Sequence, residues 1–259
     1  MTPSEWKEKK VLELKKQKVK PYQKISNNFI DNAIHKNNAH AIKTIFYLAS
    51  IIDTFDFNKE LDTIIIDLRK MFKYTGLTAQ EARDNFRAMQ KTSITFLNEA
   101  EEWEENITLV PRIKFHYGKN LIEIDLYSKI AKLIIEVKNN YTFINTASIM
   151  KLKSKHSLRI LPLLETIRGY DEDIPKRKKM SLNALNDFFG TKYKTIYEIE
   201  RKILNPVKEE LDINSNISFI FETHTENLGK GRPKATHITL DVVSKEKKLN
   251  KNIQRRLIE

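Results

Sequence analysis

Hydrophobic residues recur at helical spacing in some stretches of the chain and alternate with polar residues in others. In the first half, apolar positions repeat every three or four residues over 39–52, which predicts a helix. Thr78-Ala79-Gln80-Glu81 has the form of a capping box and opens a helix that we expect to end near Lys91. The other elements predicted here are strands at 63–66, 93–97, 107–116 and 121–126, and helices at 67–74 and 128–138. Helix, strand, helix, helix and strand ribbon is the order of a winged helix.

The same order returns in the second half without obvious sequence identity to the first. The stretch SLNALNDFFGTKYKTIYEIERKIL, residues 181–204, predicts two helices joined by a tight turn at Gly190. The later stretch GKGRPKATHITL, residues 229–240, predicts a basic hairpin. The remaining predictions are helices at 146–152 and 155–169 and strands at 217–223 and 236–243. The expected fold class is therefore α+β, with two tandem winged-helix domains.

Charge is distributed unevenly, although the chain as a whole carries +12. We expect four parts: a basic arm at 1–24, a first winged-helix domain at 25–139, a second at 140–244 and a basic tail at 245–259. Residues 25–139 carry 15 basic and 16 acidic side chains, whereas 140–244 carry 17 and 13. The second domain is therefore the expected main reader of a polyanion, and the nearly neutral first domain suits a protein interface as well.

Composition excludes several other classes of protein. The chain has no cysteine, so it has neither a disulfide framework nor a thiolate zinc site. No apolar run approaches the roughly 20 residues of a membrane span, and the N-terminus lacks the apolar middle of a signal peptide. We expect a cytoplasmic protein that needs no cofactor or metal and does not bind membranes.

The helix predicted from Lys194 carries the candidate reading residues. Ile196, Ile199, Ile203 and Val207 form one apolar stripe, so the opposite side is the candidate reading face. We define this reading face as Lys194, Tyr197, Glu198, Arg201, Lys202 and Asn205. Arg reads guanine, Asn reads adenine and Glu accepts from cytosine, whereas the two lysines suit phosphates. The alternative is an ordinary solvated helix face.

Pro206 predicts a kink or break near Leu204–Asn205. A proline inside a continuous helix clashes with the carbonyl four residues earlier. With Asn205 as N-cap and Pro206 at the first helical position, a second helical segment restarts there. Base reading is then confined to the segment before the break.

Three further groups of basic residues are candidate DNA contacts. The hairpin offers Lys230, Arg232 and Lys234 to a narrow, AT-rich minor groove, unless it is only a flexible loop tip. The start of the 155–169 helix offers phosphate contacts from Ser154, Lys155 and Arg159; simple capping by Ser154 is the compatible alternative. In the first domain, the helix that opens at the capping box is the corresponding reading helix, and it offers Arg83, Arg87 and Lys91.

Three motifs in their order and spacing resemble the initiator (Rep) proteins of iteron-containing bacterial plasmids. They are LKSKHSLRILPLLE at 152–165, KYKTIYEIERKILNPVKEEL at 192–211 and the basic hairpin. The segment Leu161-Pro162-Leu163 departs from the family pattern, which has an aromatic and an acidic residue here. The resemblance implies two winged-helix domains without enzymatic activity. It implies monomers that bind iterons in double-stranded origin DNA, and homodimers in equilibrium with them that repress their own gene at an inverted repeat. The opened origin DNA then recruits the host replication initiator and helicase.

Two alternatives come from other classes. A dedicated winged-helix transcriptional repressor would occupy an operator without any role in initiation. A rolling-circle nickase needs a His-hydrophobe-His metal pair, which none of the six histidines forms. His224 and His237 lie on neighbouring predicted strands without a carboxylate partner in the pattern, which favours a structural role. No nucleotide-binding G-x-x-x-x-G-K-[ST] motif is present.

Overall fold

The chain divides into two compact units, Met1–Pro162 and Leu163–Glu259. The computed structural model describes residues 14, 18–27, 39–52, 57–98, 102–133, 141–170, 173–226 and 233–244. The arm, the tail and the hairpin residues Lys230 and Arg232 lie outside these ranges, apart from Leu14 and residues 18–24 of the arm. Each unit is described separately below.

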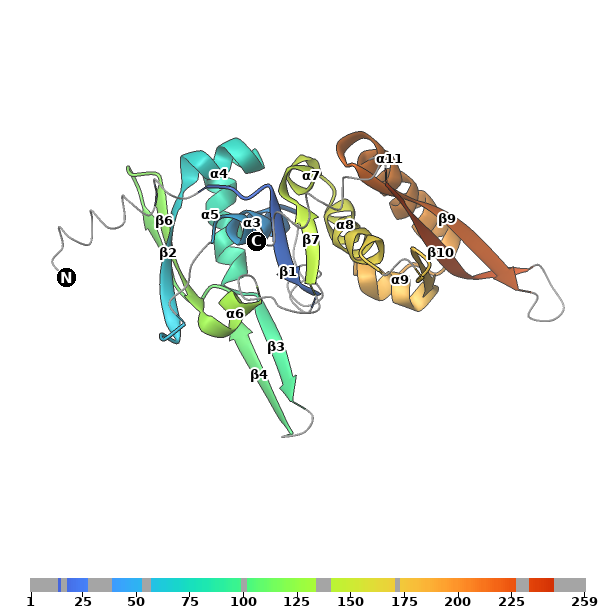
Figure 1. The fold of residues 1–259 in the computed structure, drawn as a ribbon, viewed down its shortest axis with the longest axis horizontal. Helices are drawn as coiled ribbons and strands as arrows, with labels where there is room; N and C mark the ends of the chain where they lie inside the picture. Colours follow the sequence, from blue (N-terminus) through green and yellow to red (C-terminus); the bar gives the residue numbers. More distant parts are fainter. Residues whose placement is uncertain are drawn as a thin grey trace. The chain divides into compact units, whose positions relative to one another are not determined.

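Unit 1 packs three helices beside a three-stranded antiparallel sheet (Figure 1). The helices are α3 (Ala39–Ile51), α4 (Leu68–Thr75) and α5 (Ala79–Met89), and the strand order is β2 (Leu61–Asp67), β6 (Leu121–Tyr127), β5 (Ile113–His116). The most buried large side chains include Phe46, Tyr47 and Phe86. The capping box at Thr78 and Glu81 is present, as predicted. Helix, strand, helix, helix and β-ribbon therefore form the first winged helix.

The central strand β6 is buried on both faces. Ile122 and Ile124 are fully buried, as the alternation predicts, but Glu123 and Asp125 are also only 5% and 4% exposed. Asp125 accepts hydrogen bonds from Arg112 and, at 2.8 Å, from the Thr63 hydroxyl. Although burial raises the pKa of Asp125, these hydrogen bonds hold it below its ordinary value overall. The two buried carboxylates of this strand thus have hydrogen-bond partners, since Glu123 also contacts His116.

Two small antiparallel ladders in unit 1 differ from the predicted strands. The predicted strand at 107–116 is wrong as one element, because β4 (Trp103–Thr108) and β5 are separate and pair with different strands. β4 pairs with β3 (Ser93–Asn98) to form a hairpin that extends away from the helices of the unit (Figure 1). β1 (Tyr22–Ser26) pairs with β7 (Tyr141–Asn145).

The β1–β7 ladder places Tyr141–Asn145 in unit 1. The predicted boundary between residues 139 and 140 falls inside unit 1, because β7 pairs with β1 and is followed by α7 (Thr146–Lys151). Two lysines also tie helix ends together here. Lys43 Nζ donates to Met150 O at 2.9 Å, and Lys20 Nζ donates to Ile52 O at 3.0 Å. A cation near the C-terminus of a helix is favoured by the helix dipole, so these two charges stabilise the fold.

The helix α8 (Lys155–Arg168) contains Pro162 and is continuous along its length. The division between the two units falls directly after this proline. α6 (Ser128–Lys132) is the last helix of unit 1 described before β7, and it covers only the first part of the predicted helix at 128–138.

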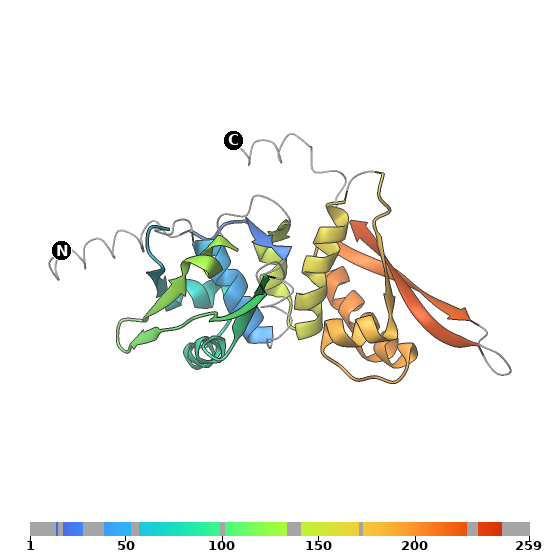
Figure 2. The same cartoon turned by 90° about the horizontal axis from the view of Figure 1, so that it is seen from below.

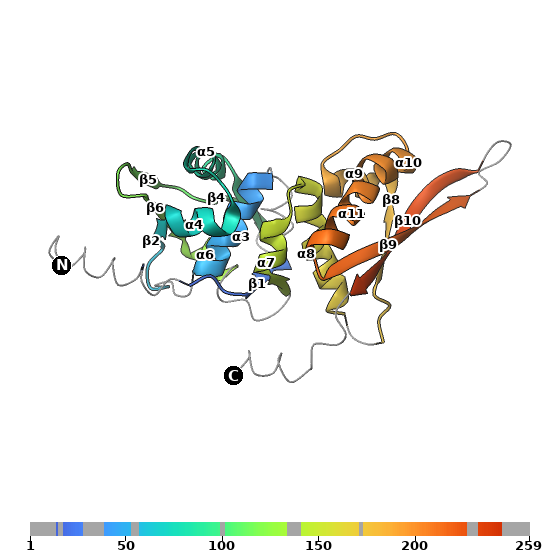
Figure 3. The same cartoon turned by 90° about the horizontal axis from the view of Figure 1, so that it is seen from above.

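Unit 2 combines a helix-turn-helix with a three-stranded sheet (Figures 2 and 3). The helical elements are α9 (Leu182–Phe189), α10 (Ile196–Ile199), the π-helical turn η2 (Glu200–Leu204) and α11 (Asn205–Asn214). The strand order is β8 (Arg177–Ser181), β10 (Lys234–Ser244), β9 (Ile217–Glu226). β9 and β10 form the long hairpin that extends beyond the helices in Figure 2.

The core of unit 2 lies between the helices and the inward face of the sheet. Fully buried members include Phe189, Phe219 and Leu240. β8 was not predicted, because its sequence RKKMS is mostly charged and only Met180 is buried. The strand forms through its pairing with β10, where Met180 lies opposite Ile238. Within the described ranges, no helix is long and apolar enough to cross a membrane.

Candidate nucleic-acid interface

The turn between α9 and α10 is closed by local hydrogen bonds. Ser181 caps α9 by accepting from Ala184 N at 3.3 Å, and Gly190 ends the helix in the left-handed conformation with φ +63°. Glycine adopts this backbone conformation without steric cost, and Gly190 is where the sequence predicted the tight turn. Thr191 N then donates to Asn186 O at 2.8 Å.

Asn186 determines the shape of the turn, and it was not singled out from the sequence. Its Oδ1 accepts from Tyr193 N at 2.9 Å and from Thr191 Oγ1 at 2.8 Å. Its Nδ2 donates to Tyr193 O at 2.9 Å. An Asn in the last turn of a helix, four residues before the glycine of the turn, is the available signal, since Asn side chains often bond nearby backbone groups.

The predicted apolar stripe of the second helix is confirmed. Ile196, Ile199, Ile203 and Val207 are each at most 1% exposed. The helix begins at Ile196, with Thr195 as its N-cap accepting from Glu198 N at 3.3 Å. Burial of the stripe leaves the opposite side of the helix toward solvent.

The helix does not break near Leu204–Asn205, so that part of the prediction is wrong, but the helix is irregular there, because a π turn ends at Leu204. Leu204 and Asn205 both have helical backbone angles, and Asn205 N donates to the Glu200 carbonyl five residues earlier. The helix passes Pro206 by widening into a π turn. This wider hydrogen-bonding pattern accommodates a residue that has no N–H and whose ring conflicts with the carbonyl of Lys202 in α geometry.

Most of the reading face is exposed. Tyr197 is 67% exposed, and Lys194, Arg201, Lys202 and Asn205 are exposed as well. Three cations, an amide and an aromatic side chain thus occupy the solvent side of the segment from Lys194, just before α10, to the start of α11. These are side chains that hydrogen-bond base edges and phosphates.

Glu198 differs from the rest of the reading face. Its Oε2 accepts from Lys194 N at 3.1 Å and from the Thr195 hydroxyl at 3.3 Å. The hydrogen bond from the Lys194 backbone and the charge of Lys202 hold the pKa of Glu198 below its usual range. Its carboxylate completes the cap of the helix, which competes with the predicted contact to cytosine.

Lys202 is held near the turn. Its Nζ lies 4.8 Å from the centroid of the Tyr193 ring and 3.7 Å from Glu198 Oε1. A cation over an aromatic face is attracted by the ring quadrupole. The side chain is still 43% exposed, so its charge remains accessible to a phosphate.

The hairpin contributes one described candidate. Lys234 is the first residue of β10 and is exposed, opposite Glu226. Farther along the ladder His224 and His237 are directly paired, as predicted from neighbouring strands, and their rings stack with centroids 4.4 Å apart. His224 Nε2 lies 3.0 Å from the Thr239 hydroxyl. Throughout the described ranges, no three His, Cys, Asp or Glu side chains are grouped to hold a metal.

The candidates of unit 1 lie on the outward side of α5 and in the turn that follows it. The Arg83 guanidinium is 5.9 Å from the Tyr117 ring centroid, and that of Arg87 is 5.4 Å from the Phe115 ring centroid. Arg87 also pairs with Asp84 at 2.9 Å. Lys91 is exposed just after the helix. Both arginines thus hold α5 to the β5 region, and the carboxylate of Asp84 offsets the charge of Arg87.

At the start of α8 the three predicted phosphate contacts differ. Ser154 Oγ accepts from His156 N at 3.1 Å, which is the capping role left open by the sequence, and Lys155 is exposed. Arg159 is only 6% exposed, and burial lowers its pKa. Its predicted phosphate contact is therefore corrected: the guanidinium lies inside the protein, away from any phosphate surface.

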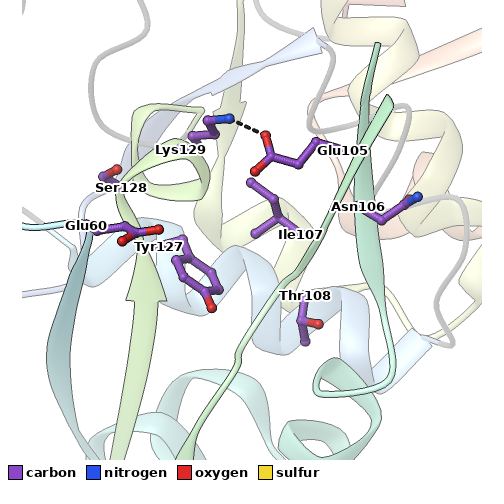
Figure 4. Close-up of a pocket in the computed structure, with 8 residues that line it drawn as sticks. All are labelled: Glu60, Glu105, Asn106, Ile107, Thr108, Tyr127, Ser128 and Lys129. Atoms are coloured by element: carbon purple, nitrogen blue, oxygen red, sulfur yellow. Dashed lines mark hydrogen bonds and ion pairs between the residues drawn. The ribbon is translucent and has the colours of Figure 1, made fainter. Parts of the chain in front are cut away.

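A cavity of about 260 Å³ lies in unit 1 between β4 and the junction of β6 with α6 (Figure 4). Glu60 and Glu105 line it, and Glu105 pairs with Lys129 at its rim. The two carboxylates make this cavity unsuited to a phosphate.

Two helix-turn-helix units, each followed by a β-ribbon, define a tandem winged-helix protein. Residues 22–165 match the family model described as initiator replication protein, WH1, and residues 181–244 match the one described as initiator Rep protein, WH2. The chain belongs to this family of replication initiators, in agreement with the resemblance noted from its motifs.

Solved structures agree on the fold. A crystal structure of the Pi initiator protein in complex with iteron DNA matches 89% of this chain and 100% of its own, with a TM-score of 0.71 and 14% sequence identity. At that identity the likeness shows the shared fold. No curated protein matches the chain.

Proposed function

We propose that this protein is a plasmid replication initiator that binds repeated sites, the iterons, in double-stranded origin DNA. The observation that carries the proposal is the exposed reading face of unit 2. A buried stripe fixes one side of α10 and η2, and the opposite side presents Arg201, Lys202 and Tyr197 next to a closed helix-turn-helix turn. Family membership and the iteron DNA bound by the structurally similar Pi initiator support the same assignment.

The residues divide into two roles. Arg201 and Asn205 read base edges in the major groove, because a guanidinium and a carboxamide each make bidentate contacts to purines. Lys194, Lys202 and Lys155 contact phosphates, and Tyr197 adds a hydroxyl at the groove wall. Lys234, with Lys230 and Arg232 outside the described residues, approaches the minor groove.

Unit 1 contributes a second, weaker DNA contact through Arg83, Arg87 and Lys91, and a surface for a second copy of the chain. Within unit 1, residues 25–139 carry 15 basic and 16 acidic side chains, and this nearly neutral balance supports the division of labour. Monomers occupy iterons, whereas homodimers occupy an inverted repeat in the operator and repress transcription. Host initiator and helicase supply the enzymatic steps, and the chain itself acts by binding.

Footprinting on the plasmid's own origin tests the proposal. Protection at regularly spaced repeats, followed by strand opening of supercoiled origin DNA with host factors, is the expected result. Protection without opening would identify a dedicated repressor instead. A covalent protein–DNA product would identify a nickase.

A further inference from the structure

The π turn η2 lies in the middle of the reading face. It joins four residues of α-helix, α10, to the ten residues of α11. Because Asn205 N bonds to the carbonyl five residues earlier, this turn contains more residues than an α-helical turn. Asn205 is therefore presented at a different rotation about the helix axis, relative to α10, than a continuous α-helix would give it.

Glu200 opens the π turn and also anchors it. Its carbonyl accepts the Asn205 N–H, and its carboxylate accepts a hydrogen bond from the Thr223 hydroxyl on β9. Both side chains are half-buried, whereas the next two residues of the helix are exposed. The Glu200 carboxylate thus points to the sheet and away from the reading face.

Thr223 lies on the strand that leads into the hairpin. It pairs with Ile238 of β10, and the same ladder ends at the Glu226–Lys234 pair. The hydrogen bond between Glu200 and Thr223 therefore connects the helix proposed to enter the major groove with the strand that carries the hairpin proposed to reach the minor groove.

We propose that Glu200 is a positioning residue for DNA recognition. Through Thr223 it holds the π turn against β9, which fixes the rotation of Arg201 and Asn205 and their spacing from the hairpin. If the reading face and the hairpin are held as one rigid body, they lose less conformational freedom on binding DNA than two independent elements would. Both can then make their contacts only on DNA in which the two contact sites have the matching spacing. This role rests on the proposed function and specifies which contact outside the reading face sets its specificity.

Two pairs of variants isolate the hydrogen bond. Thr223→Val removes the hydroxyl at nearly constant shape, whereas Thr223→Ser keeps it. Glu200→Ala removes the acceptor, whereas Glu200→Gln removes the charge and keeps an acceptor oxygen. Glu209→Ala, at an exposed position of α11, is the control for loss of one acidic charge.

Each full-length variant is titrated against a duplex with the origin repeat and against a scrambled duplex. Hydrogen exchange at the Asn205 amide is measured in the absence of DNA. Thr223→Val and Glu200→Ala should each lower the preference for the repeat about tenfold, as expected from one hydrogen bond to a charged group, and should speed exchange. Their double variant should lose no more than either alone. Thr223→Ser and Glu209→Ala should stay within about twofold of the parent, and Glu200→Gln should lose less than Glu200→Ala, because it keeps a weaker, neutral acceptor.

Unchanged preference and unchanged exchange in Thr223→Val would overturn the positioning role. An equal loss of preference in Glu200→Gln and Glu200→Ala would also overturn it, because charge would then be the cause. If the parent protein itself shows no preference for the repeat, the proposed function fails. The exchange measurement then decides the positioning role alone: faster exchange only in Thr223→Val and Glu200→Ala supports it, and any other pattern overturns it.

Discussion

The side-chain amide of Asn186 pairs with the backbone of Tyr193 in both directions. Its Oδ1 accepts from Tyr193 N and its Nδ2 donates to Tyr193 O, each at 2.9 Å. The pair resembles the reciprocal hydrogen bonds of two antiparallel strand residues. One side chain thereby fixes the path of the chain between α9 and α10.

Replacing Asn186 with alanine removes both of these hydrogen bonds and the one with Thr191. Because the site is half-buried, we expect Asn186→Ala to lower the free energy of unfolding by about 1–3 kcal/mol. Urea unfolding measures the change. Asn183→Ala, at an exposed position of the same helix, is the matched control and should change stability by less than about 0.5 kcal/mol. Equal losses in the two variants would contradict the role of Asn186.

Gly190 ends α9 in the left-handed region, with φ +63°. A side chain with a Cβ is strained there, so Gly190→Ala should destabilise the protein by about 1–2 kcal/mol. Asn tolerates this conformation better than Ala. Gly190→Asn should therefore be the more stable of the two variants in thermal unfolding, and the reverse order would argue against the left-handed cap.

Arg201 and Lys202 are adjacent and exposed, yet we assign them to different parts of the DNA. Arg201→Ala should cost about 1–3 kcal/mol on the repeat and relax specificity at one base position. Lys202→Ala should weaken all sequences about equally and flatten the dependence of affinity on salt. Titrations on single-base variants of the repeat, at several salt concentrations, measure both effects. Identical behaviour of the two variants would refute the assignment.

The pKa of His156 is lowered to about 4 by burial, with further contributions from the charges of Lys155 and Arg159. The unfolded chain takes up this proton near its ordinary pKa of 6.5, before the folded protein does. Stability from the neutral ring is therefore fully present above pH 6.5 and is lost as the pH falls toward 4.

Solvent screens this half-buried ring, so we expect the loss to be on the order of 1 kcal/mol. Urea midpoints at pH 7 and pH 4.5 for the parent and for His156→Gln measure it. The variant should lose less stability on acidification than the parent does. An equal loss in both proteins would place the acid sensitivity elsewhere.

Local patterns predicted the local parts of the structure. The stripe from Ile196 to Val207 depends only on helical spacing, and the capping box at Thr78 depends only on residues within one turn. Both are present as predicted. The three motifs that resemble plasmid initiators all lie in the predicted second domain, and the order of elements in both halves predicted the tandem winged-helix fold.

Contacts between distant residues were beyond the reach of these patterns. β1 and β7 pair across more than a hundred residues, and β8 is a strand only because β10 lies beside it. Arg159 has a sequence position suited to a phosphate contact, but the packing around α8 buries it. Pro206 predicted an irregularity in the helix, but not its form, because the helix widens into a π turn instead of breaking. The Glu200 carboxylate of this turn accepts a hydrogen bond from Thr223 on β9, 23 residues away, which no local pattern could show.

Equilibrium titration of the full chain with a duplex carrying the origin repeat, beside a scrambled duplex of equal length at one fixed salt concentration, tests the central claim most directly. We predict that the repeat binds at least about 10³-fold more tightly, as specific DNA-binding proteins do. Equal affinity for the two duplexes would contradict the claim that this protein recognises iterons.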